Sequence, residues 1–204
     1  QLKYHSTPFK YIFKLRLSMP QNQKMAQKAL AALARFLAAE KAMKLRHLSN
    51  DAAEDAALNF NRDLAEVSVA AYALHKILTK EHIIKNPKWA EAKRRISQSL
   101  SKALGALQAG NGQEFRKHLK SVSEYVRELD RELGNYFQKT FEKARIKQAS
   151  RAYAAGLSMG QAAELMGTEA RHLQSYVGVT TIHEEIKAKK SVKERLKSLR
   201  EVLG

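Results

Sequence analysis

The clearest pattern in the chain is a pair of apolar seams whose members lie alternately four and three residues apart. The first seam consists of Phe60, Leu64, Val67, Ala71, Leu74 and Leu78. The second consists of Phe115, Leu119, Val122, Val126, Leu129, Leu133 and Tyr136. This spacing puts the members of a seam on one face of an α-helix, and it is typical of long helices that pack side by side. The sequence therefore predicts an all-α fold, a long antiparallel helical bundle.

Four bundle helices are predicted from the apolar stripes and from the residues that start or stop helices. Their expected ranges are 20–48, 51–80, 86–107 and 113–136. Pro20 and Pro87 suit the first turn of a helix, Ser49–Asn50 is the expected stop between the first two helices, and Gly110–Gly112 separates the last two. The fourth helix could continue to Ala155, with Gly134 as the joint. We expect the bundle to span residues 19–140, although the two seams could also pair between two chains of a homodimer.

Both ends of the chain carry basic amphipathic segments. In residues 1–18, apolar and aromatic residues alternate with Lys and Arg, which indicates an extended arm, and Met19 could be an alternative start. This arm could pack on the bundle, remain a tail, stack on bases or contact a membrane surface. Residues 181–204 are expected to hold a basic tail helix at Ser191–Leu203, which could dock on its own domain or a partner, or attach to a membrane surface.

Between the bundle and the tail, Gly156–Val179 reads as a helix-turn-helix within a predicted unit at 141–180. Gly167 is placed to close the first helix in a left-handed conformation. Ala163 lies where the two helices should cross, and Thr168 would have to cap the second helix one residue early. The residues expected to form a small core with the preceding helix are Leu165, Met166, Leu173 and Tyr176. A helical hairpin with a glycine corner, without any binding role, is the alternative.

The net charge of +17 favours acidic partners, with nucleic acid ahead of anionic membrane. The charge is unevenly distributed. Residues 1–48 hold ten Lys and Arg against one acid, whereas residues 151–180 hold two of each sign. Affinity for nucleic acid should therefore come largely from flanking helices, through phosphate contacts.

The remaining composition excludes several kinds of site. The chain has no cysteine, so disulfides and thiolate metal sites are absent, and we expect a cytoplasmic protein. No apolar run is long enough for a transmembrane segment. The seven histidines are scattered, and only Glu169 and His172 have the Glu-x-x-His spacing of a di-iron bundle. A zinc protease motif and a phosphate-binding glycine loop are also missing. We therefore expect no metal, no cofactor and no catalytic activity.

The run Gln161–Gly167, followed by Tyr176, Gly178 and Thr180, resembles the C-terminal region of small archaeal helix-turn-helix regulators and antitoxins. The resemblance covers about 35 residues of the 204. It implies DNA binding, self-repression of an operon and a protein partner. The chain departs from these relatives at Glu169–Ala170, where they often carry a basic or aromatic residue.

These observations predict a transcriptional regulator that binds double-stranded DNA. Arg171, His172, Gln174 and Ser175 are expected to face base edges. The expected phosphate contacts are Thr168, Ser158, Gln161, Lys147 and Arg151, with further basic residues Lys24, Lys28 and Arg35 on the first helix. The alternatives are a protein-interaction scaffold or antitoxin-like partner, and an RNA-associated protein that binds through the first helix and the tail.

Overall fold

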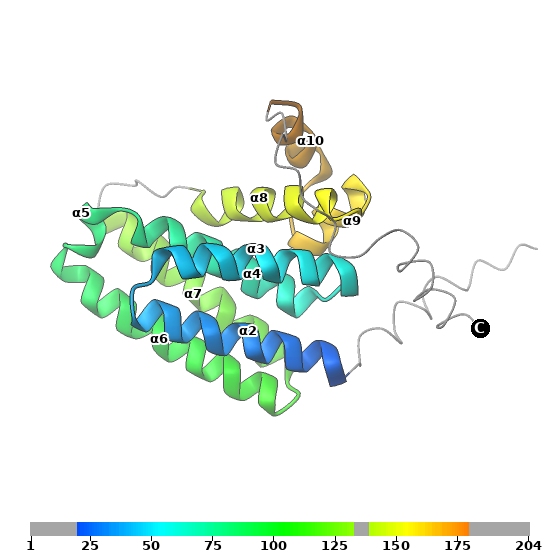
Figure 1. Cartoon of the computed structure of the whole chain (residues 1–204). Helices are drawn as coiled ribbons and strands as arrows, with labels where there is room; N and C mark the ends of the chain where they lie inside the picture. Colours follow the sequence, from blue (N-terminus) through cyan, green and yellow to red (C-terminus); the bar gives the residue numbers. More distant parts are fainter. Residues whose placement is uncertain (1–19, 133–138, 180–204) are drawn as a thin grey trace, which may run out of the picture.

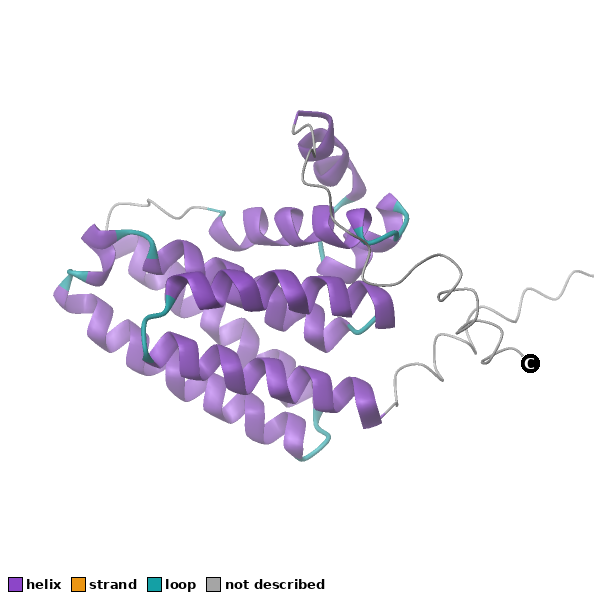
Figure 2. Ribbon diagram, viewed as in Figure 1, coloured by secondary structure: helices purple, strands orange, loops and turns teal. Residues whose placement is uncertain are grey.

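A computed structural model of the chain describes residues 20–132 and 139–179. These residues form α-helices joined by short loops, without a strand among them (Figures 1 and 2). In chain order the helices are α2 (Pro20–Ala38), α3 (Ala42–Asn59), α4 (Arg62–Leu78), α5 (Glu81–Ile84), α6 (Pro87–Gln108), α7 (Gly112–Glu132), α8 (Thr140–Ala154), α9 (Met159–Met166) and α10 (Ala170–Val179). The predicted all-α helical bundle is confirmed.

Helix α4 lies at the centre of the bundle. It packs against α2, α3, α7, α8 and α9, and its sequence is apolar around most of its circumference. Its buried residues are Leu64, Ala65, Val67, Ser68, Val69, Ala70, Ala71, Ala73, Leu74, His75, Ile77 and Leu78. Helix α3 presents four buried alanines, Ala52, Ala53, Ala56 and Ala57, which allow the two backbones to approach closely. A helix with this composition is stable in water only when other helices cover it on several sides.

The predicted boundary between the first two helices is wrong. The first helix ends at Ala38 instead of Leu48, and α3 runs through the expected stop at Ser49–Asn50. Ser49 is buried, and its hydroxyl donates to the carbonyl of Arg46 at 2.8 Å, so it is accommodated inside the helix. The turn occurs instead at Glu40, which has a positive φ of 52°.

Bonds from a distant helix hold this first turn. Lys93 of α6 donates to the Glu40 carboxylate at 2.7 Å, and the indole N–H of Trp89 donates to the same oxygen at 3.3 Å. The hydrogen bond from Lys93 lowers the pKa of the Glu40 carboxyl. The left-handed conformation costs a residue other than glycine about 1–2 kcal/mol, which these contacts help to offset.

The predicted second helix is likewise divided. Phe60 has a positive φ of 48° and ends α3, and Asn61 caps α4. Asp51, which was expected in a first turn, therefore lies within α3. The first seam is buried from Leu64 to Leu78, whereas Phe60 is half-buried at the turn. Two short helices thus cover the range in which the pattern indicated one long helix.

The later boundaries follow the sequence more closely. Asn86 caps α6 in front of Pro87, and a break at residues 109–111 precedes α7. The continuation of the fourth helix to Ala155 is wrong, because Lys139 has a positive φ of 71° and a new helix begins at Thr140. The short helix α5 was not predicted. Gly134, the arm at 1–18 and the tail helix Ser191–Leu203 lie outside the described residues.

None of the helices in the described ranges is long and apolar enough to cross a membrane.

Asn61 provides a direct test of how the α3–α4 turn is held. Its side-chain oxygen accepts from the backbone N–H of Leu64 at 3.1 Å, and its amide nitrogen donates to the carbonyl of Asn22 on α2 at 2.8 Å. We expect Asn61→Ala to lower the free energy of unfolding by about 2 kcal/mol, through loss of a cap and a buried hydrogen bond. Asn86→Ala, which removes only a cap, should cost about 1 kcal/mol. Urea denaturation measures both, and equal losses would contradict the role of the bond to Asn22.

The burial of His75 predicts that the fold is sensitive to acid. Its buried ring donates through Nδ1 to the carbonyl of Ala42 at 2.9 Å. Burial lowers the pKa of His75, the bond to Ala42 partly opposes this, and the charges of Lys76 and Arg46 lower it further. The unfolded chain therefore binds this proton more readily, so the free energy of unfolding should fall as the pH drops below about 6.5.

The variant His75→Gln should flatten this pH dependence, because an amide does not titrate. Urea denaturation at about pH 5 and about pH 7.5 measures the slope. The control is His47→Gln, which removes an exposed imidazole from α3. An equal change of slope in the two variants would contradict the assignment to His75.

Candidate nucleic-acid interface

Helix α9 begins with a capping box. The backbone N–H of Gln161 donates to the Ser158 hydroxyl at 3.2 Å, and the backbone N–H of Ser158 donates to the Gln161 side-chain oxygen at 3.0 Å. Both residues are exposed and were predicted phosphate contacts. Their side chains already satisfy two backbone donors at the start of the helix, which fixes where the helix begins.

Gly167 closes α9 as the sequence predicted. It has a φ of 66°, and the backbone N–H of Thr168 donates to the carbonyl of Ala163 at 2.9 Å. The N-cap position of α10 falls on Glu169, whose carbonyl accepts from the N–H of Leu173 at 3.2 Å. Thr168 lies one residue earlier and is half-buried. The turn between the two helices is therefore three residues long, and Thr168 precedes the cap position.

Arg145 of α8 attaches this helix pair to the bundle. Its guanidinium makes two bonds to the Glu66 carboxylate on α4, at 3.0 and 2.9 Å, and a third to the carbonyl of Met166 at 2.7 Å. Arg62 also pairs with Glu164 of α9. Because Met166 is the last residue of α9, Arg145 fixes the glycine corner relative to α4.

Apolar contacts complete the attachment. Ala163 at the expected crossing is buried, and so are three of the four predicted members of the small core, namely Leu165, Met166 and Leu173. Tyr176 is half-buried. The buried residues of α9 and α10 belong to the same hydrophobic core as the buried residues of the bundle, including those of α4.

Helix α10 presents one exposed face. Arg171, His172, Gln174 and Ser175 are all exposed, while Leu173 between them is buried. The helix packs on α8 and α9 and projects from the body of the bundle (Figure 1). Arg171 pairs with Glu169 at the start of the same helix. The structure therefore brings the four predicted base-contacting residues together on an accessible surface.

Three lysines occur just before and within α8, and the last of them, Lys147, lies beside α10. Lys143 and Lys147 are four residues apart and share one face of α8. Lys139 lies four residues before Lys143, at the N-cap position that precedes the helix. The Lys147 ammonium lies 5.8 Å from the centre of the Tyr176 ring on α10. Lys139 and Lys143 are exposed. We name Lys139, Lys143 and Lys147 the α8 lysine row.

Arg151 lies on the same face of α8, one interval further along, but its side chain has another role. It pairs with Glu54 of α3 at 3.1 Å, and the two side chains are only 13% and 14% exposed. A buried pair of this kind cannot reach a phosphate without breaking. Arg151 thus holds α8 to α3 and does not belong to the surface around α10.

The basic residues of the first helix lie elsewhere. Lys24, Lys28 and Arg35 are exposed on α2, which Figure 1 shows on the opposite side of the molecule from α10. The two predicted nucleic-acid surfaces are therefore separate.

Among the described residues, no group of His, Asp and Glu is arranged to hold a metal ion.

No family model, curated protein or solved structure matches the chain, so the resemblance to archaeal regulators stays a prediction.

Sequence reasoning missed Arg145 and the first two members of the α8 lysine row. The four-residue spacing of Lys139, Lys143 and Lys147 was a usable signal, of which only Lys147 was predicted as a contact. Arg145 gave no such signal, because its partners Glu66 and Met166 are distant in the sequence.

The glycine corner can be tested by adding one methyl group. A Cβ at Gly167 would lie 2.7 Å from Nη1 of Arg145, in addition to the left-handed backbone. We expect Gly167→Ala to lower the free energy of unfolding by at least about 1–2 kcal/mol. Gly160→Ala in the same helix meets open space and should be neutral or slightly stabilising. Urea denaturation compares them, and similar stabilities would show that the corner tolerates a side chain.

Proposed function

We propose that this protein is a non-catalytic, double-stranded DNA-binding protein of the transcriptional-regulator class, and that α10 enters the major groove. The observation that carries the proposal is the exposed face of α10, with Arg171, His172, Gln174 and Ser175 on a helix that projects from the bundle. A major groove about 12 Å wide admits one α-helix. The short turn with a left-handed glycine suits such a helix pair.

The chemistry of these side chains supports reading of base edges. Gln174 can pair with adenine through two hydrogen bonds and Arg171 with guanine, each contributing about 1–3 kcal/mol of discrimination. Arg171 must exchange its pair with Glu169 for the base. That exchange costs little, because an exposed ion pair contributes about 0–1 kcal/mol.

The α8 lysine row supplies the phosphate contacts in this proposal. The pair α9–α10 carries no positive surplus, since Glu164 pairs with Arg62 of α4 and Glu169 pairs with Arg171 of α10. The three lysines, of which Lys147 lies against Tyr176 of α10, would bind the DNA backbone and release counterions. Ser158, Gln161 and Thr168 lie at the ends of α9 and could add neutral contacts to phosphates.

The proposal is tested with a pool of randomised DNA duplexes, from which a preferred sequence is selected. Arg171→Ala and Gln174→Ala should each reduce the preference for the selected over a scrambled duplex by about tenfold. Arg94→Ala and Gln98→Ala on α6 are matched controls, because they remove the same residue types from an exposed face far along the chain. Fluorescence anisotropy measures the dissociation constants.

Loss of the phosphate contacts should change the affinity and its salt dependence and leave the sequence preference unchanged. Lys143→Gln with Lys147→Gln should weaken both duplexes alike and lower the slope of log affinity against log salt by about two. Retention of sequence preference in Arg171→Ala and Gln174→Ala would contradict the proposed role of α10.

The same anisotropy measurement, made with duplex DNA and with structured RNA, distinguishes the RNA-associated alternative from the regulator. If the basic face of α2 carries binding instead, Lys24→Glu with Lys28→Glu should abolish binding of duplex DNA and structured RNA alike. Equal affinity for the two ligands, unaffected by Arg171→Ala, would favour an RNA-associated protein over the regulator.

A further inference from the structure

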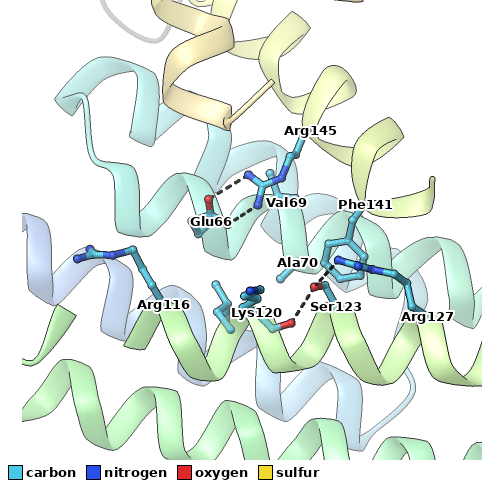
Figure 3. A pocket seen from close by; sticks show the side chains of 10 residues that line it. Glu66, Val69, Ala70, Arg116, Lys120, Ser123, Arg127, Phe141 and Arg145 are labelled. Carbon is cyan, nitrogen blue, oxygen red and sulfur yellow. Dashed lines mark hydrogen bonds and ion pairs between the residues drawn. The ribbon is translucent and has the colours of Figure 1, made fainter. Parts of the chain in front are cut away.

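A further set of basic residues lines a groove between α4, α7 and α8 (Figure 3). The volume of this groove is about 320 Å³, at the lower end of the range for small-molecule sites. The lining residues are Glu66, Val69, Ala70, Arg116, Leu119, Lys120, Ser123, Arg127, Phe141 and Arg145. They include four cations and one carboxylate.

Helix α7 contributes most of the polar lining through one face. Arg116, Lys120, Ser123 and Arg127 are spaced four, three and four residues apart, so they form a single row along the helix. Figure 3 shows Arg116 at one end of the groove, and Arg127 with Ser123 and Phe141 at the other. This row lies beside the apolar seam of α7, and sequence reasoning assigned it no role.

The four cations differ in whether they are paired with a carboxylate. Arg145 pairs with Glu66, and Arg116 pairs with Asp63 at 3.1 Å. Lys120 lies 4.0 Å from Glu124, at the outer limit of an ion pair, and its side chain is 74% exposed. Within the described ranges, the Arg127 guanidinium donates one hydrogen bond, to the Ser123 hydroxyl at 3.4 Å, and pairs with no carboxylate. Lys120 and Arg127 therefore remain available to an anion.

The position of these two cations suits one shared anion. They lie seven residues apart, which is about 10.5 Å along a helix, and both side chains are long enough to reach a group between them. Ser123 lies on the same face between them, and its hydroxyl donates to the carbonyl of Lys120 at 2.7 Å. A phosphate monoester carries a charge of about −1.5 to −2 at neutral pH, which matches two cations better than a carboxylate does.

The other lining residues are apolar. Val69 and Ala70 of α4 and Leu119 of α7 are buried, and Phe141 of α8 is half-buried. A phosphate alone would make no apolar contact with these side chains. A flat apolar group attached to the phosphate could pack on them and on the Phe141 ring.

We propose that this groove binds the phosphate monoester of a small organic molecule, with the phosphate between Lys120 and Arg127 and its apolar part against Phe141. The site does not include α10 and does not depend on the proposed DNA binding.

Isothermal titration calorimetry of the full chain tests the proposal with four probes. Phenyl phosphate carries both features, inorganic phosphate only the charge, benzoate a single charge on a ring, and phenol only the ring. Phenyl phosphate should bind at one site and at least about tenfold more tightly than each of the others. Equal binding of phenyl phosphate and inorganic phosphate would overturn the role of the apolar lining.

Matched variants locate the binding. Lys120→Gln and Arg127→Gln should each weaken phenyl phosphate binding by about tenfold or more, through loss of a charge-assisted bond. Lys117→Gln is the control, because Lys117 is on the same helix but does not line the groove. Phe141→Leu should weaken phenyl phosphate but not inorganic phosphate. These exposed or half-buried positions allow thermal unfolding to confirm that each variant folds.

Three results would overturn the proposal. The first is no saturable binding of phenyl phosphate in the millimolar range. The second is an equal loss in Lys117→Gln. The third is a loss of duplex DNA affinity in Lys120→Gln and Arg127→Gln with no binding of phenyl phosphate, which would assign the groove to nucleic-acid phosphates. Loss of phenyl phosphate binding with unchanged DNA binding keeps the two proposals distinct.

Discussion

The burial of α4 is the constraint on which the other helices depend. Its apolar surface extends around the helix, so helices from both halves of the chain must cover it: α2 and α3 from the first half, and α7, α8 and α9 from the second. Its polar residues are accommodated individually, as when the Ser68 hydroxyl donates to the carbonyl of Ala65 at 2.7 Å. Consequently the predicted division at residue 140 separates helices that share one core. Helices α8 and α9 are part of the cover of α4.

Helix α8 packs on both α4 and α10, so its position in the bundle determines where the exposed face of α10 lies. Its contacts with the bundle are made by small buried residues such as Ala144, Ala149 and Ala152, which bury little area but allow close approach. Two arginines define its position, Arg145 through Glu66 of α4 and Arg151 through Glu54 of α3. A guanidinium that binds a carboxylate through two parallel bonds restricts orientation as well as distance. The position of α8, on which α10 packs, is therefore set by two ion pairs as well as by apolar contacts.

Local signals predicted the elements whose boundaries are made by local bonds. The cap at Asn86, the capping box at Ser158 and the glycine corner at Gly167 each involve residues within a few positions of one another. The turns at Glu40 and Phe60 lack glycine and proline, and the second was missed although Asn61 supplies a local cap to Leu64. The first depends on Lys93 and Trp89, about fifty residues away along the chain. The same distinction applies to the candidate interface. The exposed face of α10 followed from helical periodicity, whereas the pairing of Arg151 with Glu54 joins residues 97 apart in sequence.

The distribution of positive charge explains why total charge is a poor guide to the binding surface. The chain has 37 Lys and Arg against 20 Asp and Glu, and some of these cations, such as Arg145 and Arg151, are paired with carboxylates inside the fold. The exposed cations are distributed over many of the described helices, among them α2, α7 and α8. Arg145 contributes to two surfaces, since it lines the groove and also holds the end of α9 at Met166. A substitution of Arg145 would therefore disturb the α10 surface and the groove together. Only residues that belong to one surface, Gln174 on α10 or Arg127 on α7, can assign a ligand to either of them.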